Sequence, residues 1–361
     1  MSDVAPATPA TAPDTRRGFA SDNHAAVHPE VVEALVAANE GHAPAYGADA
    51  LTAATRNRFR EHFGPDADAW LVFNGSGANV ASIDALTRSF EAVICTETAH
   101  MNVDECGAPE RIAGSKLFAV ATEHGKLTPG DVSRWEARRG DDHFPQPRLV
   151  SITQATELGT VYTLDETRAI ADATHRLEML LHVDGARLAN AAAELDASLG
   201  ELTTEAGVDV VSFGGTKNGL MFGEAVVFLR PGLGEGFEFV RKQLGQLASK
   251  MRYVAVQFDA LLRDDLWLRN ARHANAMAGR LADRLAELAG VEVVHPVEAN
   301  AVFARLPRPA IDRLLSDWPY EQPFYLWDEA RDEVRWMCSW DTTEDEVDRF
   351  GAAIAEAVAS G

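Results

Sequence analysis

Lys217 is the residue of this sequence whose surroundings best suit covalent chemistry. It lies in the run Gly-Gly-Thr-Lys-Asn-Gly, between apolar segments at 209–213 and 224–229 that have the composition of strands. A lysine on a glycine-rich turn at a strand end is held by a rigid scaffold and stays accessible to a bound molecule, as an amine that forms a Schiff base must be. An ordinary loop lysine would have the same local sequence, so this segment alone leaves both interpretations open.

Asp184 adds a carboxylate at the end of another predicted strand. It follows the apolar residues 179–183 and precedes Gly-Ala-Arg and a helical pattern. Ligands of open α/β sheets bind at this end of the strands, although an aspartate here could equally serve only as a helix N-cap. Pyridoxal phosphate binds a lysine through its aldehyde and a carboxylate through its ring nitrogen, which makes the ring an electron sink. Lys217 and Asp184 together therefore predict a pyridoxal phosphate site.

A Gly-Ser-Gly turn is the candidate phosphate site. The sequence Asn74-Gly-Ser-Gly-Ala-Asn79 follows the apolar run 70–73 and opens a predicted helix. Free backbone N–H groups and the helix dipole favour an anion at such a turn. The pattern Gly75-x-Gly77 also matches half of a dinucleotide fingerprint, but the third glycine is replaced by Val80. A nicotinamide-dependent oxidoreductase is therefore the alternative from a different class.

Short apolar segments alternate with helical patterns over most of the chain. Predicted strands lie at 70–73, 92–95, 116–120, 149–153, 179–183, 209–213 and 224–229, and helical patterns include 29–39, 77–87 and 164–175. This alternation predicts an α/β fold with a largely parallel sheet that is covered by helices.

The pattern changes after about residue 255. A long amphipathic stretch at 253–288 is followed by strand-like segments at 291–294, 301–305 and 333–338 and by a helical pattern at 344–358. These segments predict a smaller α+β domain. We therefore expect a disordered, Ala/Pro/Thr-rich tail at 1–17, a cofactor-binding large domain at 18–255 and a small C-terminal domain at 256–361.

Composition limits the classes of partner. The chain has 361 residues, with 33 Lys+Arg against 55 Asp+Glu and a formal charge of −22. This charge disfavours nucleic acid and anionic membrane surfaces, but it allows a local pocket for a small anion. The sequence has no apolar run long enough for a membrane span and no secretory signal pattern, and its 3 cysteines form neither a disulfide framework nor a metal motif. We expect a cytoplasmic enzyme that acts on small molecules. No ligand cluster in the sequence indicates a metal site, although a structural cation is compatible with it.

In their order along the chain, the motifs resemble those of the threonine aldolase family of fold type I pyridoxal-phosphate enzymes, particularly its low-specificity L-threonine and phenylserine aldolase branch. The resemblance runs from about Phe19 to about Asp341. The matching motifs are Ser21-Asp-Asn23, Tyr46-Gly47, Asn74-Gly-Ser-Gly-Ala-Asn79, Thr98-Ala-His100, Glu105-Cys-Gly-Ala108, His143-Phe144, His182-Val-Asp-Gly-Ala-Arg-Leu-Ala-Asn190, Thr216-Lys-Asn-Gly219, Lys250-Met-Arg252 and Arg335. The resemblance implies an aspartate aminotransferase-like large domain, a smaller α+β domain, and a homodimer or homotetramer whose subunits share active sites.

The resemblance also implies residue roles. Lys217 would form the internal aldimine, Asp184 would pair with the pyridinium nitrogen, and His100 would stack on the ring. Cofactor contacts are implied for Lys217, Asp184, Arg187, His100, Ser76, Gly77, Ala78, Gln154 and, from a neighbouring subunit, Arg252. Substrate contacts are implied for Ser21, Tyr46, Arg187 and Arg335. Two departures from the family pattern, Gln154 in place of an asparagine and Trp340 in place of a histidine, bear on the substrate pocket.

The implied reaction is retro-aldol cleavage of an L-β-hydroxy-α-amino acid to glycine and an aldehyde. A base must remove the β-hydroxyl proton, and His100 and His143 are the candidates. We expect His143, or a water molecule that it holds, because His100 is assigned to stacking. The alternatives at the same cofactor are β-elimination and transamination. A relative that binds the cofactor without catalysis is a further alternative.

Overall fold

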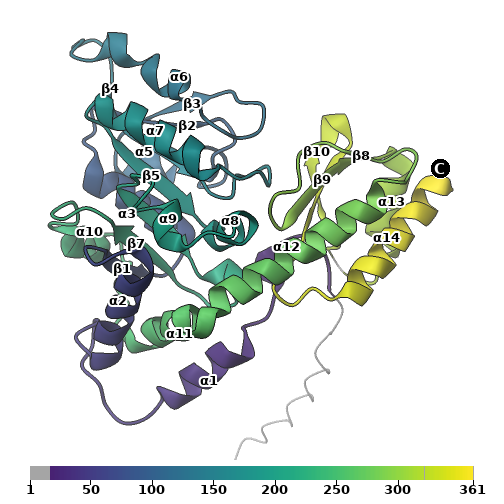
Figure 1. Cartoon of the computed structure of the whole chain (residues 1–361), viewed down its shortest axis with the longest axis horizontal. Helices are drawn as coiled ribbons and strands as arrows, with labels where there is room; N and C mark the ends of the chain where they lie inside the picture. The colour runs from purple at the N-terminus through teal and green to yellow at the C-terminus, as the bar shows by residue number, and fades with distance from the viewer. Residues whose placement is uncertain (1–16, 321, 361) are drawn as a thin grey trace, which may run out of the picture.

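Two β-sheets organise the computed structural model, which describes residues 17–320 and 322–360. One sheet has seven strands and the other has four. Figure 1 shows a large lobe around the first sheet and a smaller lobe around the second, with the long helix α12 (Leu266–Leu285) running from one lobe to the other. The larger sheet precedes the smaller one along the chain.

The seven-stranded sheet has the strand order β1-β7-β6-β5-β4-β2-β3. Its strands are β1 (Asp68–Val72), β2 (Glu91–Thr96), β3 (Lys116–Val120), β4 (Gln146–Thr153), β5 (Leu180–Gly185), β6 (Val210–Gly214) and β7 (Glu224–Phe228). Strands β2 to β6 pair in parallel, and β7 is antiparallel to both of its neighbours. The predicted α/β fold with a mostly parallel sheet is confirmed. Because β5 and β6 are parallel neighbours, Asp184 and Lys217 lie at the same edge of the sheet.

Apolar side chains cover both faces of this sheet. Val211 of β6 packs in a cluster with Phe59 of α2 (Ala50–Phe63) and Phe258 of α11 (Arg252–Leu262). Its neighbour Val210 belongs to a second cluster with Phe237 of α10 (Phe237–Gln243). Side chains alternate between the two faces along a strand, so a strand with a core on each face needs apolar residues at successive positions. The continuous apolar runs in the sequence reflect this burial.

The other helices of the large lobe precede or connect these strands. They are α1 (Pro29–Ala37), α3 (Gly75–Leu86), α4 (His100–Val103), α5 (Ala108–Ile112), α6 (Pro129–Ser133), α7 (Leu164–Arg176), α8 (Leu188–Leu195) and α9 (Leu199–Leu202). The amphipathic stretch at 253–288 forms two helices, because Asp264 and Asp265 have left-handed φ angles of 51° and 55° between α11 and α12. Within the described ranges, no helix is long and apolar enough to cross a membrane.

The four-stranded sheet forms the smaller lobe. Its antiparallel strands are β8 (Glu292–Val293), β9 (Ala301–Arg305), β10 (Tyr325–Asp328) and β11 (Glu333–Met337), and it packs with α12, α13 (Arg308–Asp317) and α14 (Glu344–Ala359). Ala271 at the start of α12 belongs to the core of the large lobe, whereas Met277 belongs to the core of the small lobe. The side chains of α12 therefore pass from the core of the large lobe to the core of the small lobe within this helix. This change lies later in the chain than the domain boundary predicted at residue 255.

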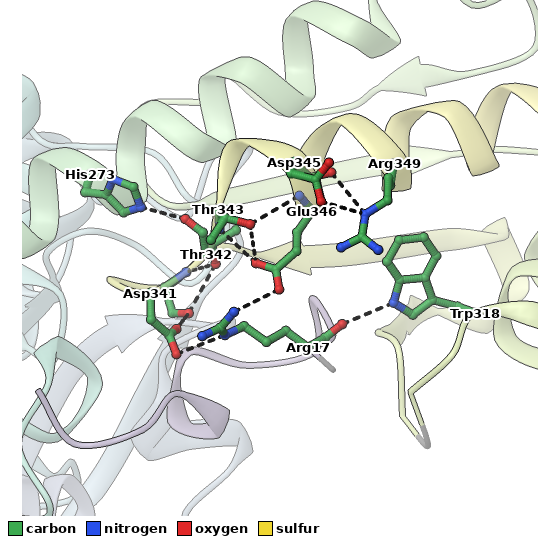
Figure 2. Close-up of polar contacts among 10 residues, drawn as sticks. Arg17, His273, Trp318, Asp341, Thr342, Thr343, Asp345, Glu346 and Arg349 are labelled. Carbon is green, nitrogen blue, oxygen red and sulfur yellow. Dashed lines mark hydrogen bonds and ion pairs between the residues drawn. The ribbon is translucent and has the colours of Figure 1, made fainter. Parts of the chain in front are cut away.

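The first described residues are attached to the small lobe. Figure 2 shows the Arg17 guanidinium between Asp341 and Glu346 at the start of α14, at N···O distances of 3.2 and 2.9 Å. The indole N–H of Trp318 donates to the Arg17 carbonyl oxygen over 3.2 Å. Phe19 stacks on Phe350 with ring centroids 4.3 Å apart. The segment that leads to Ser21 is thus fixed to the small lobe, although the sequence assigned it to the large domain.

The predicted tail at 1–17 is described only at its last residue. Residues 1–16 lie outside the described ranges. Arg17 itself makes two ion pairs with the small lobe.

Candidate active site

A cavity at the carboxyl ends of the parallel strands lies between the two lobes. Five residues proposed from the sequence line it together, namely Ser21, His100, Arg187, Lys217 and Arg335. They come from an N-terminal turn, α4, the β5–α8 connection, the β6–β7 connection and β11. The remaining lining residues are Asn23, Asp104, Ala155, Thr156, Glu157, Gly159, Ala299, Asn300, Ala301, Trp327 and Met337. Chain segments far apart in the sequence therefore build one site.

Lys217 lies in the middle of a short helical turn, η3 (Thr216–Asn218), directly after β6. The backbone just before this turn passes very close to the β5–α8 connection. A Cβ atom on Gly214 would lie only 2.5 Å from the Ala186 carbonyl oxygen. Glycine is thus required for the backbone approach that directs the lysine to the cavity. Burial, followed by the charge of Arg187, lowers the pKa of the Lys217 ammonium. A lowered pKa favours the neutral, nucleophilic amine.

Asp184 lies near the end of β5 and is 5% exposed. Its Oδ1 accepts a hydrogen bond from the Ala186 backbone N–H over 3.1 Å. Its Oδ2 accepts one from the side-chain amide of Asn79 over 2.7 Å. Both bonds hold the carboxylate in one orientation at this end of β5, where it would pair with a protonated ring nitrogen.

His100 is the first residue of α4 and lies at the wall of the cavity. Its Nδ1 is 2.9 Å from Oε1 of Glu105, whose side chain is fully buried. The hydrogen bond to Glu105 raises the pKa of His100 against the opposing effect of burial. The ring is therefore held by a carboxylate on one side and faces the cavity with the rest of its surface.

Arg187 and Arg335 bring two positive charges to the cavity. Arg187 donates from Nε and Nη2 to the two carboxylate oxygens of Asp22, over 2.7 and 3.0 Å. Arg335 donates to the Ala20 carbonyl oxygen over 3.2 Å, and its buried Nε has no acceptor within the described residues. Burial and the charge of Arg187 lower the pKa of Arg335. An anion that reaches both guanidinium groups would relieve the repulsion between their two positive charges. A substrate carboxylate is such an anion.

Ser21 is also suited to a polar substrate group. Its Oγ accepts a hydrogen bond from the Asn23 backbone N–H over 3.2 Å. A hydroxyl that accepts in this way keeps its own hydrogen for donation into the cavity. Ser21 thus supplies a donor beside the two arginines.

The glycine turn forms the N-terminus of α3, as predicted, but its free donors differ from the predicted ones. The Gly77 N–H donates to Oδ1 of Asn74 over 2.7 Å, and the Ala78 N–H donates to the Asn74 carbonyl oxygen over 3.0 Å. Both of these N–H groups, which were predicted to contact a phosphate, therefore already have an acceptor within the chain. The N–H groups of Gly75 and Ser76 have no acceptor in the described parts of the chain and remain for a phosphate.

Gln246 covers this turn and was not expected from the sequence. Its Oε1 accepts from the Phe73 backbone N–H over 2.9 Å, and a Cβ atom on Gly77 would lie 2.4 Å from its Nε2. Glycine at position 77 thus leaves room for a polar side chain beside the turn. No motif pointed to Gln246, because it lies far from the turn in the sequence.

Gln154 does not face the cavity as the family pattern implied. Its Nε2 donates to the Tyr162 carbonyl oxygen over 2.7 Å, and its Oε1 accepts from the Tyr162 N–H over 3.0 Å. Both ends of the amide are therefore occupied by backbone. From the same connection, Glu157 lines the cavity instead. Burial raises the pKa of Glu157 to about 7.

Three further predicted residues lie away from this cavity. The His143 side chain is 93% exposed, beside Asp142 in the loop before β4, so the geometry of this chain does not support its assignment as the base. Tyr46 is 54% exposed. Arg252 donates to the backbone carbonyl oxygens of Glu40 and Gly41, so neither Tyr46 nor Arg252 contacts the cavity of its own chain.

The side chains present fit pyridoxal phosphate. Lys217 and Asp184 come from adjacent strands, and they are close enough for the Asp184 charge to raise the pKa of Lys217 in opposition to burial. Within residues 17–320 and 322–360, two N–H donors at the N-terminus of α3 have no acceptor and are available to a phosphate. The buried and unpaired Nε of Arg335 offers a further donor for an anion. A lysine, a carboxylate and an anion site are the three groups that this cofactor requires.

A mostly parallel α/β sheet with Lys217 and Asp184 at one edge defines a fold type I pyridoxal-phosphate enzyme. The chain belongs to the beta-eliminating lyase family, whose family model matches residues 18–308. It is 47% identical over 336 residues to a low specificity L-threonine aldolase from Pseudomonas aeruginosa, covering 92% of this chain and 96% of that protein. These findings confirm the predicted cofactor and enzyme class.

Solved structures agree with this assignment. A threonine aldolase from Leishmania major superposes with a TM-score of 0.89 at 30% identity, covering 95% of this chain and 100% of that one. An alanine–glyoxylate aminotransferase from Nostoc sp. superposes with a TM-score of 0.69 at 14% identity, covering 97% of each chain, and this likeness shows the fold alone.

Proposed function

We propose that this protein is a pyridoxal-phosphate-dependent aldolase that cleaves L-β-hydroxy-α-amino acids, such as L-threonine, L-allo-threonine or phenylserine, to glycine and an aldehyde. The observation that carries the proposal is the placement of Lys217, Arg187 and Arg335 in one cavity. An amino acid has an amino group for the lysine-bound cofactor and a carboxylate for the arginines. The names of the threonine aldolases to which the chain is similar support the β-hydroxy class.

The side chains of this protein bind and orient the substrate. Arg187, Arg335 and Ser21 would hold its carboxylate, which fixes the Cα–Cβ bond in one direction relative to the ring. The cofactor, when bound, withdraws the electron pair of the bond that breaks. Asp184 would keep the ring nitrogen protonated, which is the condition for that withdrawal.

His100 is the residue best placed to accept the β-hydroxyl proton. It lines the cavity, whereas His143 lies outside it on the same chain. Imidazole titrates in the range needed for proton transfer near neutral pH. We therefore assign the base to His100, in place of the expected His143. Stacking on the cofactor would engage only the face of the imidazole ring, so it leaves a ring nitrogen free for proton transfer.

We also propose that the protein works as a homodimer or homotetramer with shared sites. Tyr46 was expected at the substrate and Arg252 at the cofactor, yet in one chain both lie away from the cavity. Contact with the site of a second subunit would reconcile both placements.

The free thiols of Cys95 and Cys338, both buried, suit a reducing compartment such as the cytoplasm.

An absorption spectrum combined with product analysis tests this function. The purified protein should show a visible band that borohydride bleaches, and Lys217→Ala should lose the bleachable band and the activity. Lys116→Ala is the control, because Lys116 lies on β3 with a side chain that is 59% exposed. L-threonine should give glycine and acetaldehyde. Formation of a keto acid instead would show β-elimination or transamination, and a protein that pyridoxal phosphate cannot reconstitute would exclude the whole assignment.

A further inference from the structure

The two ring nitrogens of His100 have different surroundings. Nδ1 lies 2.9 Å from Oε1 of Glu105, while the ring is 37% exposed at the cavity. Nε2 has no hydrogen-bond partner within residues 17–320 and 322–360. An ionised carboxylate can only accept a hydrogen bond, so Nδ1 must carry a proton in this contact. In the neutral ring, Nε2 then has a free lone pair.

Glu105 is itself fixed by a second contact. The Asn79 side-chain nitrogen donates to Oε1 of Glu105 over 2.9 Å and to Oδ2 of Asp184 over 2.7 Å. Turning the amide by 180° would place its oxygen against two carboxylates, so its orientation is determined. One amide group thus links the carboxylate that holds His100 to the carboxylate that faces the ring nitrogen of the cofactor.

We propose that Glu105 is a positioning residue for the aldol cleavage, which keeps the His100 proton on Nδ1 and presents Nε2 to the β-hydroxyl group of the substrate. The proposal rests on the proposed function. In the step, the hydroxyl proton moves to Nε2, and the O–H electron pair forms the C=O bond of the aldehyde. The Cα–Cβ electron pair stays with the Cα fragment, which takes up a proton to become glycine.

The arrangement resembles that of a histidine oriented by a buried carboxylate in other enzymes that need a histidine base. Such a carboxylate selects the tautomer and stabilises the imidazolium that forms when the proton arrives. The charged groups that act on His100 are Glu105 and Asp184, which favour the protonated ring, and Lys217, which opposes it. Glu157 accepts a hydrogen bond from the His100 backbone N–H over 2.9 Å and holds the start of α4 in place.

The tautomer of His100 in the wild-type holoenzyme is the first test. Nitrogen-15 chemical shifts of the histidine rings, with His100 assigned by loss of its signals in His100→Asn, report which nitrogen carries the proton at high pH. We expect the Nδ1–H form. The Nε2–H form, which is the commoner tautomer of free histidine, would overturn the proposal. This measurement needs no activity, so it is independent of whether the proposed substrate class is right.

The second test compares Glu105→Gln, Glu105→Asp and the control Glu110→Gln, which alters a carboxylate of α5 that is 45% exposed. Glu105→Gln should shift the acid limb of the kcat/KM profile to lower pH, because the imidazolium loses its partner. It should also reduce kcat by about 10- to 100-fold with little change in KM, as expected when a base is misplaced. Glu105→Asp should recover part of kcat, and Glu110→Gln should behave as wild type.

The visible band of the bound cofactor separates this role from a merely structural one. We expect the band to remain in Glu105→Gln, because Lys217 and Asp184 are unchanged. An unaltered pH profile and kcat in that variant would refute a positioning role. If Glu105→Gln does not fold, the tautomer of the wild type and the pH profile of Glu105→Asp still decide the question. Absence of aldol cleavage by the wild type would instead refute the proposed function.

Discussion

Asp22 is the carboxylate that holds one of the two arginines of the cavity in place. Burial alone would raise the pKa of Asp22, but the charges of Arg187 and Lys217 outweigh burial and lower the pKa to about 2. Asp22 is therefore ionised at neutral pH and holds the Arg187 guanidinium by two hydrogen bonds. With Arg187 held in this way, Arg335 retains at the cavity a donor, Nε, that has no acceptor among the described residues.

Arg335 should therefore contribute mainly to substrate binding. We expect Arg335→Ala to raise KM by about 10- to 100-fold, since a charge-assisted hydrogen bond contributes about 1.5–3 kcal/mol. Arg335→Lys should recover only part of this loss, because an ammonium group cannot form the bidentate contact. Steady-state kinetics with L-threonine measure both effects, and Arg331→Ala, at an exposed position on the same lobe, is the control. A fall in kcat without a rise in KM would contradict the carboxylate role.

The sequence predicted those site residues that lie on contiguous motifs. Lys217, Asp184 and Ser21 each stand at a strand end or turn. The structure places Lys217 and Asp184 at one edge of the large sheet, and Ser21 lines the same cavity as Lys217. Asn300 and Gln246 carry no local signal, because only the tertiary fold brings them to the site.

The β6–β7 hairpin, which carries Lys217, contains a buried carboxyl group. Glu224 opens β7 and accepts a hydrogen bond from the Gly215 backbone N–H over 2.9 Å. Burial raises the pKa of Glu224 from 4.5 to about 7. The folded protein therefore retains this proton over a pH range in which the unfolded chain has lost it.

Stability should consequently fall as pH rises from about 4.5 to about 7, because the native state binds more protons than the unfolded state in that window. The decrease from this group amounts to about 2–3 kcal/mol. Glu224→Gln keeps a neutral side chain and should remove this part of the pH dependence. The free energy of unfolding, measured at pH 5 and pH 7.5 for wild type, Glu224→Gln and the surface control Glu287→Gln, gives the difference. Equal slopes for all three proteins would mean that Glu224 is ionised in the fold.

Element boundaries followed from the sequence where apolar periodicity and caps agree. The helix expected at 77–87 is α3, Gly75–Leu86, and its Asn74 cap is visible in the sequence. The antiparallel direction of β7 was not specified, because its apolar run would suit a buried strand of either direction. The break between α11 and α12 was missed, since Asp264 and Asp265 are compatible with an exposed helical face and only their φ angles reveal the interruption.

At the scale of the whole molecule, the cavity depends on the contact between the lobes. Ser21 and Asp22 face residues of the large lobe, whereas Phe19 packs in the core of the small lobe. Asn300 donates to Asp22 over 3.1 Å and to the Cys338 carbonyl oxygen over 2.7 Å. The N-terminal segment therefore connects the small lobe to the arginine of the large lobe.

Arg17 provides the first fixed point of this segment. Its ion pairs with Asp341 and Glu346 are partly exposed, so each contributes at most about 1 kcal/mol, and Arg17→Ala should lower the unfolding free energy only slightly. The same variant should raise KM several-fold with little change in kcat, because greater freedom at residues 17–20 loosens Ser21 and Asp22 without touching Lys217. Arg349→Ala, which removes another α14 ion pair, is the matched control and should leave KM unchanged.

Kinetics at low and at 0.5 M salt test the mechanism further, since screening should raise the KM of the wild type towards that of Arg17→Ala. An unchanged KM in Arg17→Ala would show that Phe19 and its backbone hydrogen bonds suffice to hold the segment.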